Sequence, residues 1–165
     1  MYRQIRTIQQ FYIAFNNRDH ATMNACYHPE ATFRDPLFDL QGKRVLAMWH
    51  MLCIGGTDLK VELVDAQRTD PGITARWRAR YRFGATDRRV HNRITSRFEF
   101  QGGRIIHQED VFNFWRWSRQ ALGWSGWLMG WNNAYRQRVA LATNRTLDKF
   151  IERHPEYQEP GSAEG

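Results

Sequence analysis

The sequence is short of cysteine and has no long apolar run, and each shortage excludes a class of protein. Its 165 residues include only two cysteines, Cys26 and Cys53, which lie far apart and form no Cys-x-x-Cys pattern. This excludes a disulfide scaffold and favours two buried, reduced thiols in a cytoplasmic protein. No stretch reaches the ~18 apolar residues of a membrane-spanning helix, and the first six residues lack the apolar core of a secretory signal. We therefore expect a cytoplasmic protein with no membrane partner.

Lysine is scarce as well, although the chain is strongly basic. Only three of the 24 basic residues are lysine, the other 21 are arginine, and the formal net charge is +7. A concentrated basic surface would indicate a nucleic-acid partner. Here the arginines are spread along the chain and interleaved with acidic residues, so we expect no binding to nucleic acid.

The composition is that of a globular protein, with 42% hydrophobic, 14% aromatic and 25% charged residues. This length favours one domain with one core. Apolar residues at helical spacing, among them Ile8, Tyr12 and Phe15, predict a first helix over residues 3–16. Two further helices are expected, at residues 19–26 and 43–54, the last ended by a glycine pair.

Strands follow the third helix, because the period of the apolar residues changes to two. A short strand at residues 31–36 precedes them, and turns at residues 70–72, 86–88 and 101–103 separate the long strands. The sequence therefore predicts an α+β fold: a cone-shaped curved antiparallel sheet of about four long strands plus short ones, packed on three N-terminal helices. In the last strand, one face is expected to carry Ile106, Gln108, Asp110, Phe112 and Phe114.

The chain changes character after residue 114. Five tryptophans fall between residues 115 and 131, interrupted by glycines, and a helix is expected from about residue 132 to 153. The tryptophans could line the mouth of a ligand pocket, or they could pack the C-terminal helix onto the domain or onto a second subunit. We divide the chain into a cone domain (1–114), a Trp-rich helical extension packed on it (115–154) and a disordered tail (155–165).

Three passages resemble the nuclear transport factor 2-like superfamily, and specifically its SnoaL-like branch. They are residues 11–19, residues 28–36 with the Gly42 that opens the third helix, and residues 97–111. The run at 114–123 resembles a bacterial subgroup of that branch. The resemblance implies a cone with a hydrophobic pocket, in a family that includes ketosteroid isomerases, polyketide cyclases and limonene epoxide hydrolases. Because fold alone does not decide function, the activity depends on which residues line the pocket.

Ketosteroid isomerases use a pocket aspartate as base, with a tyrosine and a protonated aspartic acid as donors to the oxyanion. By resemblance, Tyr12 corresponds to that tyrosine and Asp35 to that base. The second acid would fall near Ser96, where this sequence has no aspartate. The resemblance to this enzyme is therefore incomplete.

Asp110 resembles the last-strand aspartate of two other enzyme groups. Limonene epoxide hydrolases use an Asp-Arg-Asp arrangement, but their Arg-x-Asp pair would fall near Ala79 and Tyr81, which are neither basic nor acidic. SnoaL-like polyketide cyclases close a ring by acid-base chemistry without a metal, and nothing in the sequence contradicts that match. The resemblance implies no cofactor.

The residues themselves favour the same candidates, because a carboxyl on an apolar strand face is costly unless it is paired or functional. We take Asp110, Asp35 and Tyr12 as catalytic candidates. The expected pocket wall is Trp49, Trp77, Tyr81, Ser96, Phe98, Gln108 and Phe112. No histidine shows metal-ligand spacing, so no metal is expected.

Two functions remain open. The first is cofactor-independent acid-base catalysis, of isomerase, cyclase or hydrolase type, on a small apolar molecule. The second is a non-catalytic ligand-binding or assembly module. Under either, we expect a homodimer formed through the outer face of the sheet.

Overall fold

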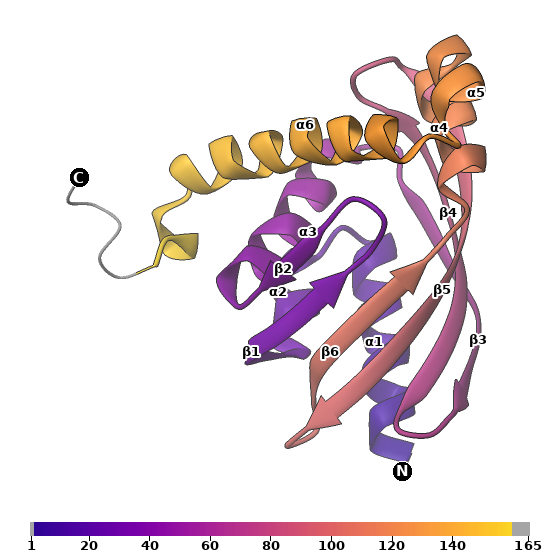
Figure 1. Cartoon of the computed structure of the whole chain (residues 1–165). Helices are drawn as coiled ribbons and strands as arrows, with labels where there is room; N and C mark the ends of the chain where they lie inside the picture. Colours follow the sequence, from indigo (N-terminus) through magenta and orange to yellow (C-terminus); the bar gives the residue numbers. More distant parts are fainter. Residues whose placement is uncertain (1, 160–165) are drawn as a thin grey trace.

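The computed structural model describes residues 2–159 and has the predicted α+β architecture (Figure 1). The helices are α1 (Tyr2–Asn16), α2 (His20–Ala25), α3 (Lys43–Gly55), α4 (Phe114–Leu122), α5 (Trp124–Met129) and α6 (Asn133–Glu152), and a 3-10 turn η1 (Pro155–Tyr157) follows. The strands are β1 (Tyr27–Arg34), β2 (Asp39–Gln41), β3 (Lys60–Arg68), β4 (Ile73–Phe83), β5 (Arg88–Gln101) and β6 (Arg104–Val111).

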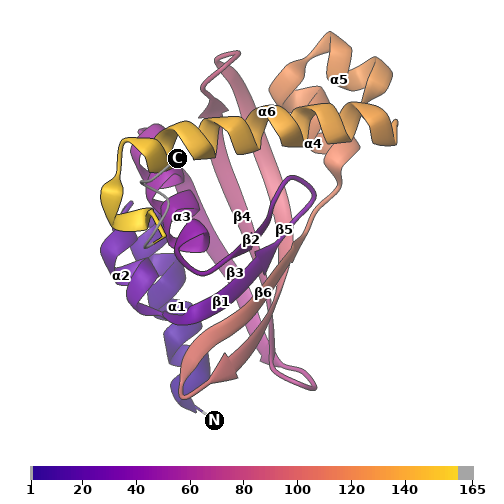
Figure 2. The same cartoon turned by 60° about the vertical axis from the view of Figure 1, so that its left-hand side comes forward.

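The six strands form one curved, unclosed sheet in the order β2-β1-β6-β5-β4-β3. Neighbours are antiparallel except β1 and β6, which run parallel. The concave side of the sheet wraps around α1, α2 and α3, as Figures 1 and 2 show. The prediction of four long strands plus short ones on three N-terminal helices is confirmed.

The main core of the protein is built on the apolar face of α1. Ile8, Phe11 and Phe15 recur at helical spacing and are all buried. The Phe11 ring lies at the centre, edge-on to Tyr27 and Trp49 at centroid distances of 5.7 and 5.3 Å. The interior of the cone is thus filled largely by aromatic side chains.

The prediction that Ile106 faces inward is wrong, and a β-bulge is the reason. Phe100 pairs with Ile105 and Glu99 with His107, so Ile106 is the extra residue on β6. The bulge shifts the alternation by one position, and Ile105 is fully buried in place of Ile106. Beyond the bulge, Gln108 and Asp110 do face the interior, as the period of two predicts.

The C-terminal extension has two parts. α4 and α5 contact each other at the end of the sheet opposite the N-terminus of α1, and α6 runs from there across to α3 (Figures 1 and 2). Leu147 of α6 is buried in the main core. The predicted disordered tail begins at residue 155, but residues 155–157 form η1 and Tyr157 is buried. Residues 160–165 lie outside the described residues.

Among residues 2–159, no helix is both long enough and apolar enough to cross a lipid bilayer.

Gly126 of α5 is required by the close approach of α4. A Cβ atom at this position would lie 2.0 Å from the Ser118 carbonyl oxygen, whereas a Cβ at Gly55 of α3 would meet nothing within 4 Å. We expect Gly126→Ala to lower the free energy of unfolding by about 1–3 kcal/mol through overpacking, and Gly55→Ala to leave it unchanged or raised. Urea denaturation of both variants measures this, and equal stabilities would contradict the close packing.

Candidate functional site

Asp110 of β6 is the only buried Asp or Glu among the described residues, and the residue is 5% exposed. Its carboxylate accepts a hydrogen bond from Ser96 Oγ on β5 and another, of 2.9 Å, from Gln108 Nε2. Both bonds fall on Oδ1. The strand register produces this contact, because Ser96 and Asp110 are paired residues on neighbouring strands. Within residues 2–159, Oδ2 therefore remains the oxygen that can take a proton.

The first of two hydrogen-bond chains that end on Asp110 starts at Trp49. The Trp49 indole donates to the Tyr27 hydroxyl over 2.8 Å, and Tyr27 donates to Gln108 Oε1. Because an indole N–H can only donate, the direction of the whole chain is fixed. It follows that the amide of Gln108 points its NH₂ group at Asp110.

The second chain converges on Ser96. Its hydroxyl oxygen accepts from the Trp77 indole at 2.8 Å and from the Tyr12 hydroxyl at 3.1 Å, and it donates to Asp110. Tyr12 comes from α1, 84 residues away in sequence from Ser96. The structure thus brings together five of the predicted site residues: Tyr12, Trp49, Trp77, Ser96 and Gln108, all around Asp110.

Burial raises the pKa of Asp110 from 3.8 to about 7. The hydrogen bonds from Ser96 and Gln108 oppose this rise, and the charge of Asp35 adds to it. Burial and the charge of Asp110 also raise the pKa values of Tyr12 and Tyr27 well above 10.0. At neutral pH both tyrosines keep their protons, while Asp110 is partly protonated and partly ionised.

Asp35 lies outside this network. Its Oδ1 accepts from the backbone N–H groups of Leu37 and Phe38, each at 2.7 Å, and so closes the turn between β1 and β2. Burial raises the pKa of Asp35 to about 6, against the effect of these two bonds. Its charge contributes to the raised pKa of Asp110, although the two carboxyl groups have different hydrogen-bond partners.

The other three residues of the expected pocket wall differ in how deeply they are buried. Phe98 is buried in the main core, whereas Tyr81 and Phe112 are partly exposed and pack against both the main core and a second cluster. That second cluster consists of Val90, Phe114, Trp117 and Ala121. The Trp117 indole donates to the Tyr81 hydroxyl over 2.8 Å, which holds α4 against β4.

Asp110, Asp35 and Tyr12 line neither of two hollows on the part of the surface that residues 2–159 form. One, of about 400 Å³, lies beside β4 and β5 around Tyr81, Arg82 and His91. The other, of about 270 Å³, lies by the turn at residues 69–74. The Asp110 network is thus packed into the interior of the cone.

Tyr27 is the residue of the network that the sequence did not reveal. The predicted strand began at residue 31, whereas β1 begins at Tyr27. Tyr27 pairs with Ile105 on β6, and the register of the β1–β6 ladder shifts between Tyr27 and Thr32. The only sequence signal for this residue is its aromatic side chain directly before the His28-Pro29 turn.

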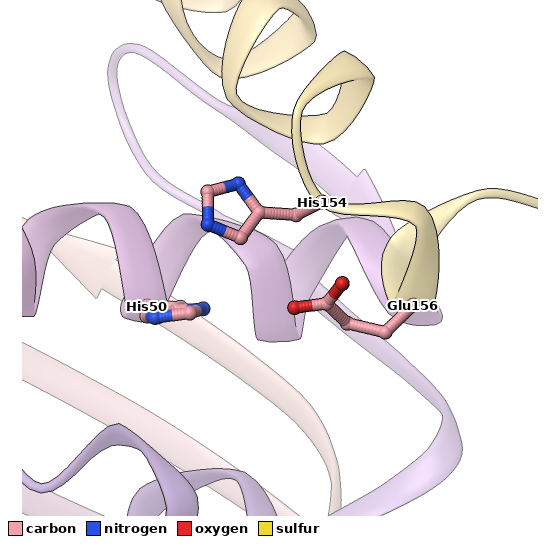
Figure 3. A group of neighbouring side chains, drawn as sticks. All are labelled: His50, His154 and Glu156. Atoms are coloured by element: carbon pink, nitrogen blue, oxygen red, sulfur yellow. The ribbon is translucent and has the colours of Figure 1, made fainter.

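His50, His154 and Glu156 gather on the far side of α3 (Figure 3), although their sequence spacing predicted no metal site. One ligand atom from each lies within 4.8 Å of the other two. His154 Nδ1 bonds to the Phe150 carbonyl, so this nitrogen carries the proton. His50 stacks on His20 at 3.5 Å and bonds to the Tyr157 hydroxyl at 2.9 Å. These contacts fasten η1 to α3. Among residues 2–159, the three side chains are the one group of three or more His, Cys, Asp or Glu residues close enough together to hold a metal ion.

A family model described as the SnoaL-like domain matches residues 8–108. No curated protein matches the chain significantly.

Solved structures share the fold at low sequence identity. The chain is similar to an LEH-like epoxide hydrolase from M. tuberculosis, with 20% identity, a TM-score of 0.62, and coverage of 73% of this chain and 90% of the other. It is similar to an NTF2-like protein of unknown function from Burkholderia pseudomallei, with 18% identity, a TM-score of 0.63, and coverage of 73% and 98%. It is also similar to a protein with a ketosteroid isomerase-like fold from Catenulispora acidiphila, with 10% identity, a TM-score of 0.62, and coverage of 70% and 91%. These likenesses concern the fold alone.

Proposed function

From the premise that this chain belongs to the SnoaL-like domain family, we propose that it is a cofactor-independent acid-base catalyst acting on a small apolar molecule. Asp110 is the proposed base. The observation that carries the proposal is a buried carboxylate with two donors on Oδ1, none on Oδ2 within residues 2–159, and a pKa of about 7. A base works best when its pKa is near the working pH.

The proposed step is a proton transfer. Oδ2 of ionised Asp110 takes a proton from the ligand or from a bound water, and the neutral acid returns it later in the cycle. Ser96 and Gln108 act as positioning residues, because their bonds to Oδ1 fix the plane of the carboxyl group. Tyr12 acts through Ser96, since its hydroxyl proton is engaged there.

The ligand is proposed to approach between the main core and the second cluster. Leu37, Tyr81 and Phe112 pack against both clusters and are each partly exposed. Asp35 lies next to Leu37 and acts electrostatically on both Asp110 and Tyr81. An apolar molecule entering here would meet Asp110 after displacing aromatic side chains rather than water.

A turnover assay with 5-nitrobenzisoxazole tests this proposal, because its ring opening needs one base and no cofactor. We expect turnover above buffer that rises with pH through about 7, as Asp110 ionises. A rate that is the same in the parent and in Asp110→Asn would reject Asp110 as the base.

Ser96→Ala supplies an independent readout of the same base. The Ser96 hydroxyl lowers the pKa of Asp110, so its removal should move the pH midpoint of turnover to higher pH. Asp39→Asn, which changes an exposed carboxyl on β2, should leave the midpoint unchanged. A midpoint that falls, or that stays in place in Ser96→Ala, contradicts the assignment.

A second candidate is a non-catalytic ligand-binding or assembly module. The filled interior and the small exposed fraction of Asp110 favour it. Native mass spectrometry of the purified protein would distinguish the two: a small molecule that co-purifies unchanged with both the parent and Asp110→Asn supports the binding module. The homodimer through the outer sheet face stays a prediction, to be measured by analytical ultracentrifugation.

A further inference from the structure

We propose that the α4–α5 hairpin and the start of α6 form a surface that binds anionic lipid headgroups at a membrane face. The proposal concerns the Trp-rich extension and does not depend on the chemistry at Asp110. It revises the expectation of no membrane partner, which followed from the absence of a spanning segment and did not bear on surface binding.

The large apolar side chains of α5, and that of Trp131 just after it, face outward. Trp124 is 75% exposed and Trp131 is 74% exposed. Trp127, Leu128 and Met129 between them are also exposed, and Trp124 stacks on Trp127. A contiguous exposed apolar patch of this kind marks an interaction site.

Backbone packing forces this outward orientation. α5 lies so close to α4 that Gly126 and Gly130 both approach Ser118, where any Cβ would come within 2.1 Å of its atoms. The Ser118 hydroxyl bonds to the carbonyls of Trp115 and Gly126. Because the inner face of α5 is glycine, its bulky residues are left on the outer face. Figures 1 and 2 show α5 projecting beyond the end of the sheet, away from the helices that fill the cone.

The segment that carries the patch is basic, and this favours an anionic occupant. Residues 111–147 contain no aspartate or glutamate and five arginines. Arg116, Arg136 and Arg138 are exposed, and Arg119 lies 4.3 Å over the Trp115 ring. Tryptophan favours the headgroup level of a bilayer, because its indole is apolar with one polar N–H. Arginine beside it favours anionic lipid over neutral lipid.

A second copy of the chain fits this surface less well. A symmetric contact through this surface would bring the basic segments of both copies together, and residues 111–147 contain no acidic residue to offset their charge. A lipid surface supplies negative charge and an apolar layer together.

Vesicle flotation with the full chain tests the proposal. We expect at least tenfold stronger binding to vesicles of phosphatidylcholine with about one quarter phosphatidylglycerol than to pure phosphatidylcholine, and weaker binding as salt rises from about 50 to about 500 mM. Trp124→Ser/Trp131→Ser should lower the binding at least tenfold. The matched control is Ile13→Ser/Ile54→Ser, which removes two exposed apolar side chains from α1 and α3 and should bind like the parent.

The contribution of charge is measured separately. Arg136→Gln/Arg138→Gln should weaken binding several-fold, whereas Arg6→Gln/Arg104→Gln, with the same change in net charge, should not. No binding to the anionic vesicles by the folded parent would overturn the proposal, as would equal binding by the tryptophan and isoleucine variants. A dimer in ultracentrifugation that Trp124→Ser/Trp131→Ser dissociates, without vesicle binding by the parent, would instead assign the surface to a second copy.

Discussion

Asp110→Asn should abolish turnover of 5-nitrobenzisoxazole while leaving the fold intact. Asparagine has nearly the same shape, and its carbonyl oxygen can accept the bonds from Ser96 and Gln108 that now reach Oδ1. Its NH₂ group, which would take the place of Oδ2, cannot accept a proton. Loss of a general base costs about 10²–10⁴-fold in rate, so we expect a decrease of at least about a hundredfold.

The same variant should be more stable than the parent at neutral and alkaline pH. Because the folded state holds the Asp110 proton more tightly than the unfolded state, the stabilising contribution of Asp110 is fully present below pH 3.8 and is lost as the pH rises through about 7. A shift of this size corresponds to about 4 kcal/mol. Asparagine has no proton to lose, so this part of the pH dependence should be absent from Asp110→Asn.

Urea denaturation between pH 4 and pH 8 measures this effect, with Asp39→Asn as the control for loss of an exposed carboxyl. We expect the control to follow the parent at every pH. If Asp110→Asn is instead destabilised at pH 8, the ionised carboxylate is a structural requirement, and its removal cannot be interpreted as the loss of a base.

Phe11→Ala should cause the largest loss of stability of any single substitution proposed for this protein. The Phe11 ring is fully buried and contacts the rings of Tyr12, Tyr27 and Trp49 at centroid distances of 5.2 to 5.7 Å. Truncation of a buried phenylalanine costs about 3–5 kcal/mol, because transfer energy is lost and a cavity remains. Two of the three neighbours, Tyr12 and Tyr27, also carry the hydrogen bonds that lead to Asp110.

The matched control is Ile13→Ala, which lies two residues away on the opposite face of α1 and is exposed. We expect it to change the free energy of unfolding by no more than about 0.5 kcal/mol. Chemical denaturation at one pH compares the two variants. A loss below about 1 kcal/mol in Phe11→Ala would contradict a close-packed interior and would favour an open cavity there.

Much of the fold was predictable because local chemistry determines it. The spacing of Ile8, Phe11 and Phe15 defines the buried face of α1 wherever that helix packs. The alternation in β6 placed Gln108 and Asp110 inside without knowledge of the neighbouring strands. The alternation fails at Ile106 because the bulge there depends on pairing with β5, and the periodicity of β6 alone carries no information on that pairing.

The sequence by itself determined that one acidic side chain, Asp110, would face an apolar interior, because a strand's period of two is a property of the backbone. Only the tertiary structure decided what surrounds that acid. Tyr12, Tyr27 and Ser96 meet there through helix packing and strand register across distant parts of the chain. It also decided that turn amides hold Asp35 and that α5 turns its tryptophans outward. These outcomes depend on which backbones approach each other, and no local pattern encodes that approach.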